Sequence, residues 1–265
     1  MNEYSQELRN KIKDYYTKVY ESVGLKNVEE KVSMRMREEE EDARRIIDLE
    51  SIARFSFGRD QKHLIVGTGT GGLAVELFKR GCQVYGIDPN EEANEITKLK
   101  AKELGMPVDN FTTDIVESLP FNDNTFDFIH CFSVIEHVSS VKGALAEMIR
   151  VLKPGIGCIC LNTPDYRFPY EGHYKIIFPT FLPKIFGYLY LLIKGRPVKF
   201  LRDVKYVTEG NINKILYKQP VIWQRIYRQY PPEWDNPPFY FFLWRFFSVH
   251  LNVPKNQEIL IRKKT

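Results

Sequence analysis

The chain has 265 residues, of which 43% are hydrophobic and 27% are charged. These proportions are typical of a folded globular protein and exclude a disordered or collagen-like chain. The formal net charge is only +4, so the overall charge does not by itself indicate a nucleic-acid partner.

The charge is unevenly distributed along the chain. Residues 1–165 carry a net charge of −7, whereas residues 166–265 carry +11 and hold 23 of the 36 aromatic residues. This asymmetry indicates an anionic partner or surface for the C-terminal part.

The N-terminal segment predicts a cytoplasmic protein, because it is charged from the start and lacks an apolar stretch of signal-peptide length. The most apolar windows, 176–193 and 239–249, are interrupted by charged residues and prolines, so neither provides the roughly 20 apolar residues of a spanning helix. Either window can still lie on a membrane, which leaves a peripheral position at its inner face as an alternative. The four cysteines lie in apolar runs without a CxxC pair, and we expect them to be reduced and buried.

Residues 4–56 are predicted to be helical, because they contain almost no glycine or proline and carry apolar residues at helical spacing. From Lys62 onward, strands alternate with helices, which predicts an α/β fold with a parallel sheet. Strands are expected near 63–66, 83–88, 111–113, 126–132, 157–162 and 258–262, and helices over 72–80, 91–104 and 140–152. Four parts follow: a helical extension (1–60), a cofactor-binding core (61–165), an acceptor-binding or membrane-facing insertion (166–256) and a last core strand (257–265).

The first strand is followed by a glycine-rich turn, Gly67-Thr68-Gly69-Thr70-Gly71-Gly72. Its glycines satisfy both the GxGxxG and the GxGxG pattern, and either spacing lets a ligand approach the backbone at a helix N-terminus. Asp88 ends the second strand, where a carboxylate can accept hydrogen bonds from two ribose hydroxyls. The two features predict a site for an adenosine-containing ligand.

Two further observations narrow the class of ligand. The loop offers no Lys or Arg before Lys79 to bind a pyrophosphate. Asp114 and Ile115 place a carboxylate and an apolar side chain at the end of the third strand, where an adenine amino group and ring face can be held.

Four segments between residues 62 and 165 resemble the class I S-adenosylmethionine-dependent methyltransferases of the small-molecule type, which include enzymes of the ubiquinone pathway. The segments are VGTGTG, YGIDPN, TTDIVESLPFNDNTFDFIHCFSVIEHV and RVLKPGIGCICLNTPD. The resemblance implies a Rossmann-like, doubly wound and mostly parallel seven-stranded sheet, with N-terminal helices, a C-terminal lid-like insertion and S-adenosyl-L-methionine as cofactor. The insertion itself looks like those of methyltransferases in glycan or lipid pathways.

The resemblance also implies roles for individual residues. The glycine loop would approach the methionine part, Asp88 the ribose, Asp114 with Ile115 the adenine, and the end of the fourth strand would line the pocket. The cofactor-binding residues so implied are Gly67, Thr68, Gly69, Gly71, Asp88, Asp114, Ile115, Phe132 and Ser133. The chain departs from the family at Ile65, two places before the first glycine, where an acidic residue usually organises the loop.

Methyl transfer to oxygen needs an aligned acceptor and a general base, for which histidine is the usual residue. His137 follows Glu136 at the expected carboxyl edge of the sheet, and His173 opens the insertion, so either is a candidate catalytic base. His137 can instead orient its loop, and His173 can be an ordinary loop residue. His130 lies within a strand and is expected to be structural. No metal-ligand spacing is found, and no metal is expected.

Basic residues stand among aromatic and aliphatic ones in the first part of the insertion, residues 172–208. Because the apolar residues form contiguous blocks, this composition suits a bilayer interface better than single-stranded nucleic acid. An aromatic core that covers the active site is the alternative.

The predicted function is therefore S-adenosylmethionine-dependent methyl transfer to a small-molecule or lipid-linked acceptor, with oxygen as the favoured target. A catalytically silent cofactor-binding module that docks on a membrane or a partner is a second hypothesis, because Ile65 breaks the pattern. An NAD-dependent oxidoreductase is a third, supported only by GxGxxG. RNA methylation is disfavoured, because no Asn-Pro-Pro-Tyr-like segment follows the fourth strand. The sequence indicates neither the identity of the acceptor nor an oligomeric state.

Overall fold

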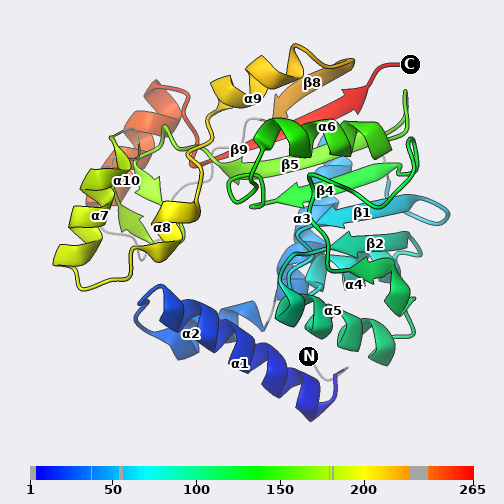
Figure 1. Cartoon of the computed structure of the whole chain (residues 1–265), viewed down its shortest axis with the longest axis horizontal. Coiled ribbons are helices and arrows are strands. Elements are labelled where there is room, and N and C mark those ends of the chain that lie inside the picture. Colours follow the sequence, from blue (N-terminus) through cyan, green and yellow to red (C-terminus); the bar gives the residue numbers. More distant parts are fainter. Residues whose placement is uncertain (1–3, 37, 54–55, 179, 181, 227–237) are drawn as a thin grey trace.

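The computed structural model describes residues 4–36, 38–53, 56–178, 180, 182–226 and 238–265 (Figure 1). The strands are β1 (Lys62–Val66), β2 (Gln83–Ile87), β3 (Phe111–Thr112), β4 (Phe128–Phe132), β5 (Cys158–Pro164), β6 (Tyr170–Glu171), β7 (Ile176–Ile177), β8 (Val221–Ile226) and β9 (Asn256–Lys263). The helices are α1 (Gln6–Ser22), α2 (Val28–Arg35), α3 (Glu38–Ala53), α4 (Gly72–Lys79), α5 (Glu91–Glu103), η1 (Val108–Asn110), α6 (Val141–Val151), α7 (Lys184–Ile193), α8 (Lys199–Asp203), α9 (Glu209–Leu216), α10 (Pro238–Trp244) and η2 (Arg245–His250).

Seven strands form one twisted sheet in the order β3-β2-β1-β4-β5-β9-β8. The strands from β3 to β5 pair in parallel, whereas β9 is antiparallel to both β5 and β8. The order reverses at β1, so the carboxyl ends of β1 and β4 flank the position where open α/β sheets bind ligands. This arrangement confirms the predicted fold class.

Helices cover both faces of the sheet, as alternation of the buried residues along β1 requires. Leu64 and Val66 pack with α6 and α9 on one face, and Ile65 packs with α3, α4 and α5 on the other. All three side chains are at most 3% exposed, and burial of each contributes about 1.5–3 kcal/mol. The four cysteines are free and buried in these layers, as the sequence predicts.

Side-chain caps determine where several helices begin, because they satisfy backbone N–H groups that the first turn leaves unpaired. Ser5, Asn90 and Ser140 accept hydrogen bonds from the first turns of α1, α5 and α6. At α9, Thr208 and Asn211 form a reciprocal capping box. The predicted N-terminal helices are present as α1, α2 and α3.

The range 166–256, expected to be one insertion, is corrected by the strand pairing. Within it, β8 pairs with β9 at the edge of the main sheet, and α9 packs on the same core. The strand escapes detection because its two fully buried residues, Val221 and Ile226, lie at its ends and do not alternate, and the four residues between them are exposed or half-buried. The added structure consists of the elements on either side, β6, β7, α7, α8, α10 and η2, which we call the lobe.

The lobe lies beyond the carboxyl ends of the parallel strands (Figure 1). It also contacts the N-terminal helices, because Arg196 donates hydrogen bonds to the carbonyl oxygens of Val23 at 2.9 Å and Tyr174 at 2.7 Å. Val23 and Tyr174 share a small apolar core with Leu191 and Leu201. Across the described part of the chain, every helix is too short or too polar to cross a membrane.

Candidate active site

The glycine loop turns sharply between β1 and α4 because three of its glycines have positive φ angles. Gly67 (φ +75°) must lack a side chain, since a Cβ atom there would lie 2.3 Å from Cγ2 of Val134. A Cβ at Gly69 (φ +58°) would meet no described atom within 4 Å, so the space beside this residue is open to a ligand. The loop is therefore packed on one side and accessible on the other.

Asp88, directly after β2, holds the loop in place. Its two carboxylate oxygens accept hydrogen bonds from the backbone N–H groups of Gly69 and Asn90, each at 2.8 Å. Burial raises the pKa of Asp88, and these two hydrogen bonds act in the opposite direction. Each oxygen retains a second lone pair, so the carboxylate can also accept hydrogen bonds from a ligand.

A cavity of about 260 Å³, which we call the loop cavity, lies against the glycine loop. Gly67, Thr68 and Gly69 line it, and Tyr16 on α1 closes it through a 3.0 Å hydrogen bond to Thr70. Its lining combines glycine backbone with aromatic and charged side chains, which suits a small ligand of mixed polarity that contacts the loop. The N-terminal helix is therefore part of the site.

Ile65 stands where the resembling family usually has an acidic residue, and a carboxylate from another element lines the same cavity. Both Ile65 and Asp42 on α3 line the loop cavity. Asp42 accepts a hydrogen bond from Arg45 at 2.9 Å, and Arg45 lies over the ring of Phe132. Asp42 of α3 therefore places a carboxylate at the loop cavity. The sequence does not indicate this position, because the acidic run 38–42 has the pattern of a solvated helix face.

The remaining predicted cofactor residues lie at neighbouring strand ends. Asp114 and the exposed Ile115 follow β3, whose Thr112 carbonyl accepts a hydrogen bond from the Asp88 N–H at 3.2 Å. Phe132 lines the loop cavity and also a second cavity of about 300 Å³, the strand-end cavity, which Ser133 lines as well. Asp114 and Ile115 line neither cavity.

The two candidate catalytic histidines, far apart in the sequence, are brought together. The ring centroids of His137 and His173 lie 5.0 Å apart, and Phe200 from α8 packs against both. Glu136 joins them, and one ligand atom from each of the three lies within 4.8 Å of the others. We call Glu136, His137 and His173 the histidine cluster.

Burial controls the charges of this cluster. Glu136 is fully buried, and burial raises its pKa although Thr163 donates a hydrogen bond to it at 2.9 Å. His137 is partly exposed, yet desolvation by the surrounding protein, and then the neighbouring His173, lower its pKa to about 4. Its imidazole is therefore neutral near pH 7. His130, which the sequence predicts to be structural, lies on β4. Its side chain is fully buried beside His63 on β1.

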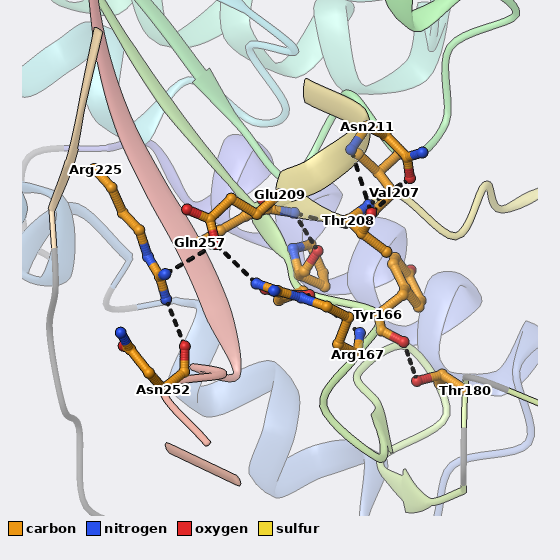
Figure 2. Close-up of polar contacts among 12 residues, drawn as sticks. Tyr166, Arg167, Thr180, Val207, Thr208, Glu209, Asn211, Arg225, Asn252 and Gln257 are labelled. Atoms are coloured by element: carbon orange, nitrogen blue, oxygen red, sulfur yellow. Dashed lines mark hydrogen bonds and ion pairs between the residues drawn. The ribbon is translucent and has the colours of Figure 1, made fainter. Parts of the chain in front are cut away.

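A network of charges joins the lobe to the sheet (Figure 2). Glu209 at the start of α9 accepts hydrogen bonds from Arg167 at 2.9 Å and from Arg225 on β8 at 2.8 Å. Arg167 also pairs with Asp165, whose side chain is fully buried. The root of the lobe is thereby fixed next to the end of β5.

Comparisons with known proteins agree with this site. A family model described as a methyltransferase domain matches residues 64–160. Demethylmenaquinone methyltransferase of Anoxybacillus flavithermus is 30% identical over 149 residues, which are 53% of this chain and 62% of that protein. Ubiquinone biosynthesis O-methyltransferase of Vibrio cholerae is 28% identical over 118 residues, which are 43% of this chain and 48% of that protein. The chain thus covers less than two thirds of the length of either relative.

The fold has a solved counterpart in an S-adenosylmethionine-dependent methyltransferase from Mesorhizobium loti. The two structures agree with a TM-score of 0.55 over 80% of this chain and 94% of that chain, at 14% sequence identity, which is a likeness of fold alone. The matches do not favour the oxidoreductase hypothesis. The glycine loop, the sheet order and the match over 64–160 together show that this chain carries a class I methyltransferase domain with S-adenosylmethionine as its cofactor.

Proposed function

We propose that the protein transfers the methyl group of S-adenosylmethionine to an oxygen atom of a small-molecule or lipid-linked acceptor. The observation that carries this proposal is the pair of adjoining cavities at the carboxyl ends of the parallel strands, which share Arg45 and Phe132. One cavity adjoins the glycine loop and suits a cofactor. The other leaves room for an acceptor beside it, so two reactants can be aligned for a displacement.

The cofactor residues proposed from the sequence have geometry that supports their roles. Gly67, Thr68, Gly69 and Gly71 would hold the methionine part. Gly67, Thr68 and Gly69 line the loop cavity, and the space beside Gly69 is open, whereas Gly71 packs against Thr97 behind the loop. Asp88 would accept hydrogen bonds from the ribose hydroxyls.

Adenine and the charged centre of the cofactor need two further contacts. Asp114 and Ile115 would flank the adenine, and Phe132 with Ser133 would complete the pocket. Asp42 would lie near the positive charge of the cofactor, in place of the acidic residue that Ile65 replaces. When bound, the cofactor supplies an electrophilic methyl group.

His137 and His173 line neither cavity. The acceptor is proposed to extend from the strand-end cavity and present a hydroxyl to these histidines, which would assist the loss of its proton. Because the imidazole of His137 is neutral near pH 7, its free lone pair can accept a hydrogen bond from the acceptor hydroxyl. His173 is oriented by Glu171, whose carboxylate lies 2.7 Å from its Nδ1 atom. A histidine held by a carboxylate in this way keeps its other nitrogen directed outward.

The lobe is proposed to meet the acceptor at a membrane surface. It exposes a set of large apolar side chains: Ile185, Phe186, Leu189, Leu192, Ile193, Phe239, Phe241, Phe242 and Phe246. The basic residues of the same part of the chain suit anionic headgroups. An amphiphilic acceptor would then reach the site without leaving the bilayer surface.

Membrane binding is tested by sedimentation with vesicles of neutral or anionic lipid. Wild type is expected to sediment with anionic vesicles and to be released by salt, because the headgroup attraction is screened. The Phe186→Ser/Leu189→Ser double variant should bind at least about tenfold more weakly, since two exposed apolar anchors are lost. Ile47→Ser, on α3 outside the lobe, is the matched control. Equal binding of all three proteins would exclude the lobe as the contact.

Catalysis is tested by incubating the full chain with methyl-labelled cofactor and separate membrane and soluble extracts. Label is expected in a lipid-soluble or small-molecule product, and Asp88→Ala should abolish it. Base-labile label would indicate a methyl ester, whereas stable label would indicate a methyl group bonded as an ether or to nitrogen or carbon. Cofactor binding without label transfer to any extract would refute the enzyme and support the silent module.

A further inference from the structure

The histidine cluster has the composition of a metal site rather than of an isolated base. It brings two imidazoles and one carboxylate within 4.8 Å of one another. Two histidines and a glutamate, with a further position left for water or substrate, are a known ligand set of catalytic zinc. Magnesium and calcium prefer oxygen ligands, so the two nitrogen donors favour a transition metal.

His173 is oriented as a metal ligand would be. Its Nδ1 atom donates to Oε1 of Glu171 at 2.7 Å, and Oε2 of the same carboxylate accepts the backbone N–H of Tyr174 at 2.7 Å. Glu171 is only 1% exposed, so both bonds are shielded from water. The arrangement leaves Nε2 of His173 as the nitrogen with a free lone pair. A carboxylate behind a histidine is the usual support of a metal-bound imidazole.

Glu136 provides an independent indication. The residue is fully buried, and its Oε2 accepts a hydrogen bond from Thr163, whereas its Oε1 has no hydrogen-bond partner among the described residues. A buried carboxylate oxygen without a hydrogen-bond partner destabilises the folded state, because it has lost its hydrogen bonds to water and has formed none within the protein.

We infer that Glu136, His137 and His173 bind one divalent transition-metal ion such as Zn²⁺, with an open position for the acceptor. In the tetrahedral geometry of zinc, two ligand atoms with bonds of about 2.1 Å lie about 3.4 Å apart. Closing the cluster from 4.8 Å therefore requires its ligand atoms to approach one another by at most about 1.4 Å. His137 can make this movement, because it lies in the turn after β4 and is partly exposed.

The role of the ion rests on the proposed function. A hydroxyl bound to a divalent ion loses its proton more readily, because the positive charge stabilises the oxygen anion. The O–H bond breaks, and the proton passes to bulk water. The oxygen would then use its electron pair to form a bond to the methyl carbon of the cofactor while the C–S bond breaks, and the sulfur of the leaving S-adenosylhomocysteine keeps the electron pair of that bond. His137 and His173 would then assist deprotonation as ligands rather than as bases.

Metal binding by the chelator-treated full chain tests the inference without any methyl acceptor. Equilibrium dialysis with Zn²⁺ should give one ion per chain, and Co²⁺ should give the visible absorption of a low-symmetry nitrogen and oxygen site. His173→Ala and Glu136→Gln should weaken Zn²⁺ binding at least about 100-fold, and Glu171→Gln, which removes only the support, about 10–100-fold.

Two controls separate loss of the site from loss of the fold. His250→Ala removes an exposed histidine of η2 outside the cluster and should bind Zn²⁺ as wild type does. Each cluster variant should still bind S-adenosylhomocysteine in calorimetry, which reports an intact loop cavity. Equal Zn²⁺ binding by wild type and by the His137→Ala/His173→Ala variant would overturn the inference.

Failure of the inference and failure of the proposed function give different results. Methyl transfer that continues at an unchanged rate in metal-free protein would overturn the metal role and leave the enzyme in place. Stoichiometric Zn²⁺ binding that is lost in the cluster variants, in a protein that labels no extract, would support the site and refute the enzyme.

Discussion

The proposed cofactor site depends most on Asp88, and replacing this residue by alanine tests the assignment. Its carboxylate holds Gly69 and Asn90 at 2.8 Å each and is proposed to accept two ribose hydroxyls as well. Hydrogen bonds to a charged group contribute about 1.5–3 kcal/mol each. Losing the two ribose bonds therefore costs about 3–6 kcal/mol, and Asp88→Ala should weaken S-adenosylhomocysteine binding about 100-fold or more.

The assay is isothermal calorimetry with S-adenosylhomocysteine, accompanied by thermal unfolding of each protein. Asp88→Asn keeps the side-chain volume and one acceptor oxygen, so it should remain folded and lose part of the affinity. Asp109→Ala, an exposed aspartate on η1, is the matched control and should bind as wild type does. Unchanged affinity in both Asp88 variants would refute the ribose assignment.

Three further predictions concern the supports of the site. Tyr16→Phe removes the hydrogen bond to Thr70, which contributes about 0.5–1.5 kcal/mol. In calorimetry the variant should bind S-adenosylhomocysteine about 2–10-fold more weakly than wild type. Equal affinity would mean that α1 does not hold the loop. Arg167→Met leaves the buried carboxylate of Asp165 without its cation. The free energy of unfolding measured in urea should fall by about 1–3 kcal/mol. An unchanged free energy of unfolding would mean that the network of Figure 2 does not stabilise the fold. Burial lowers the pKa of His63 from 6.5 to about 3. As the pH falls, His63 is therefore protonated in the unfolded chain before it is protonated in the folded protein. The free energy of unfolding should fall between about pH 6.5 and pH 3 and then level off. Urea unfolding at about pH 7.5 and pH 5 measures this fall, which should be smaller in His63→Leu; an equal fall in both proteins would assign it to other groups.

The parts of the site predicted from sequence are those that short segments encode. The glycine loop and Asp88 lie at the ends of adjacent parallel strands, and the pairing of β1 with β2 brings them to a 2.8 Å contact. Parallel pairing follows from the strand-helix-strand order, so the order of the elements along the chain already places the two side by side. The edge strand β8 escapes prediction because its two fully buried residues, Val221 and Ile226, do not show the alternation of a half-buried strand.

Asp42 and the histidine cluster show what local patterns leave undetermined. Asp42 lies in an acidic run whose solvated appearance gives no sign that α3 packs beside the glycine loop. His137 and His173 were separate candidates, and only the fold of the lobe makes them neighbours at 5.0 Å. The same fold places Glu171 behind His173 and leaves one oxygen of Glu136 unpaired among the described residues.

The sequence by itself determined the class of sheet, the cofactor loop and the division into an acidic core and a basic, aromatic remainder, because periodicity, glycine spacing and charge are local properties of the chain. Tertiary structure alone decided which carboxylate faces the loop cavity and which side chains meet at the strand ends. Those contacts join residues from separate elements, and their distances depend on how helices and lobe pack on the sheet. The residues proposed to contact the acceptor therefore come together only through tertiary packing. The residues proposed to bind the cofactor can be recognised from their order along the chain.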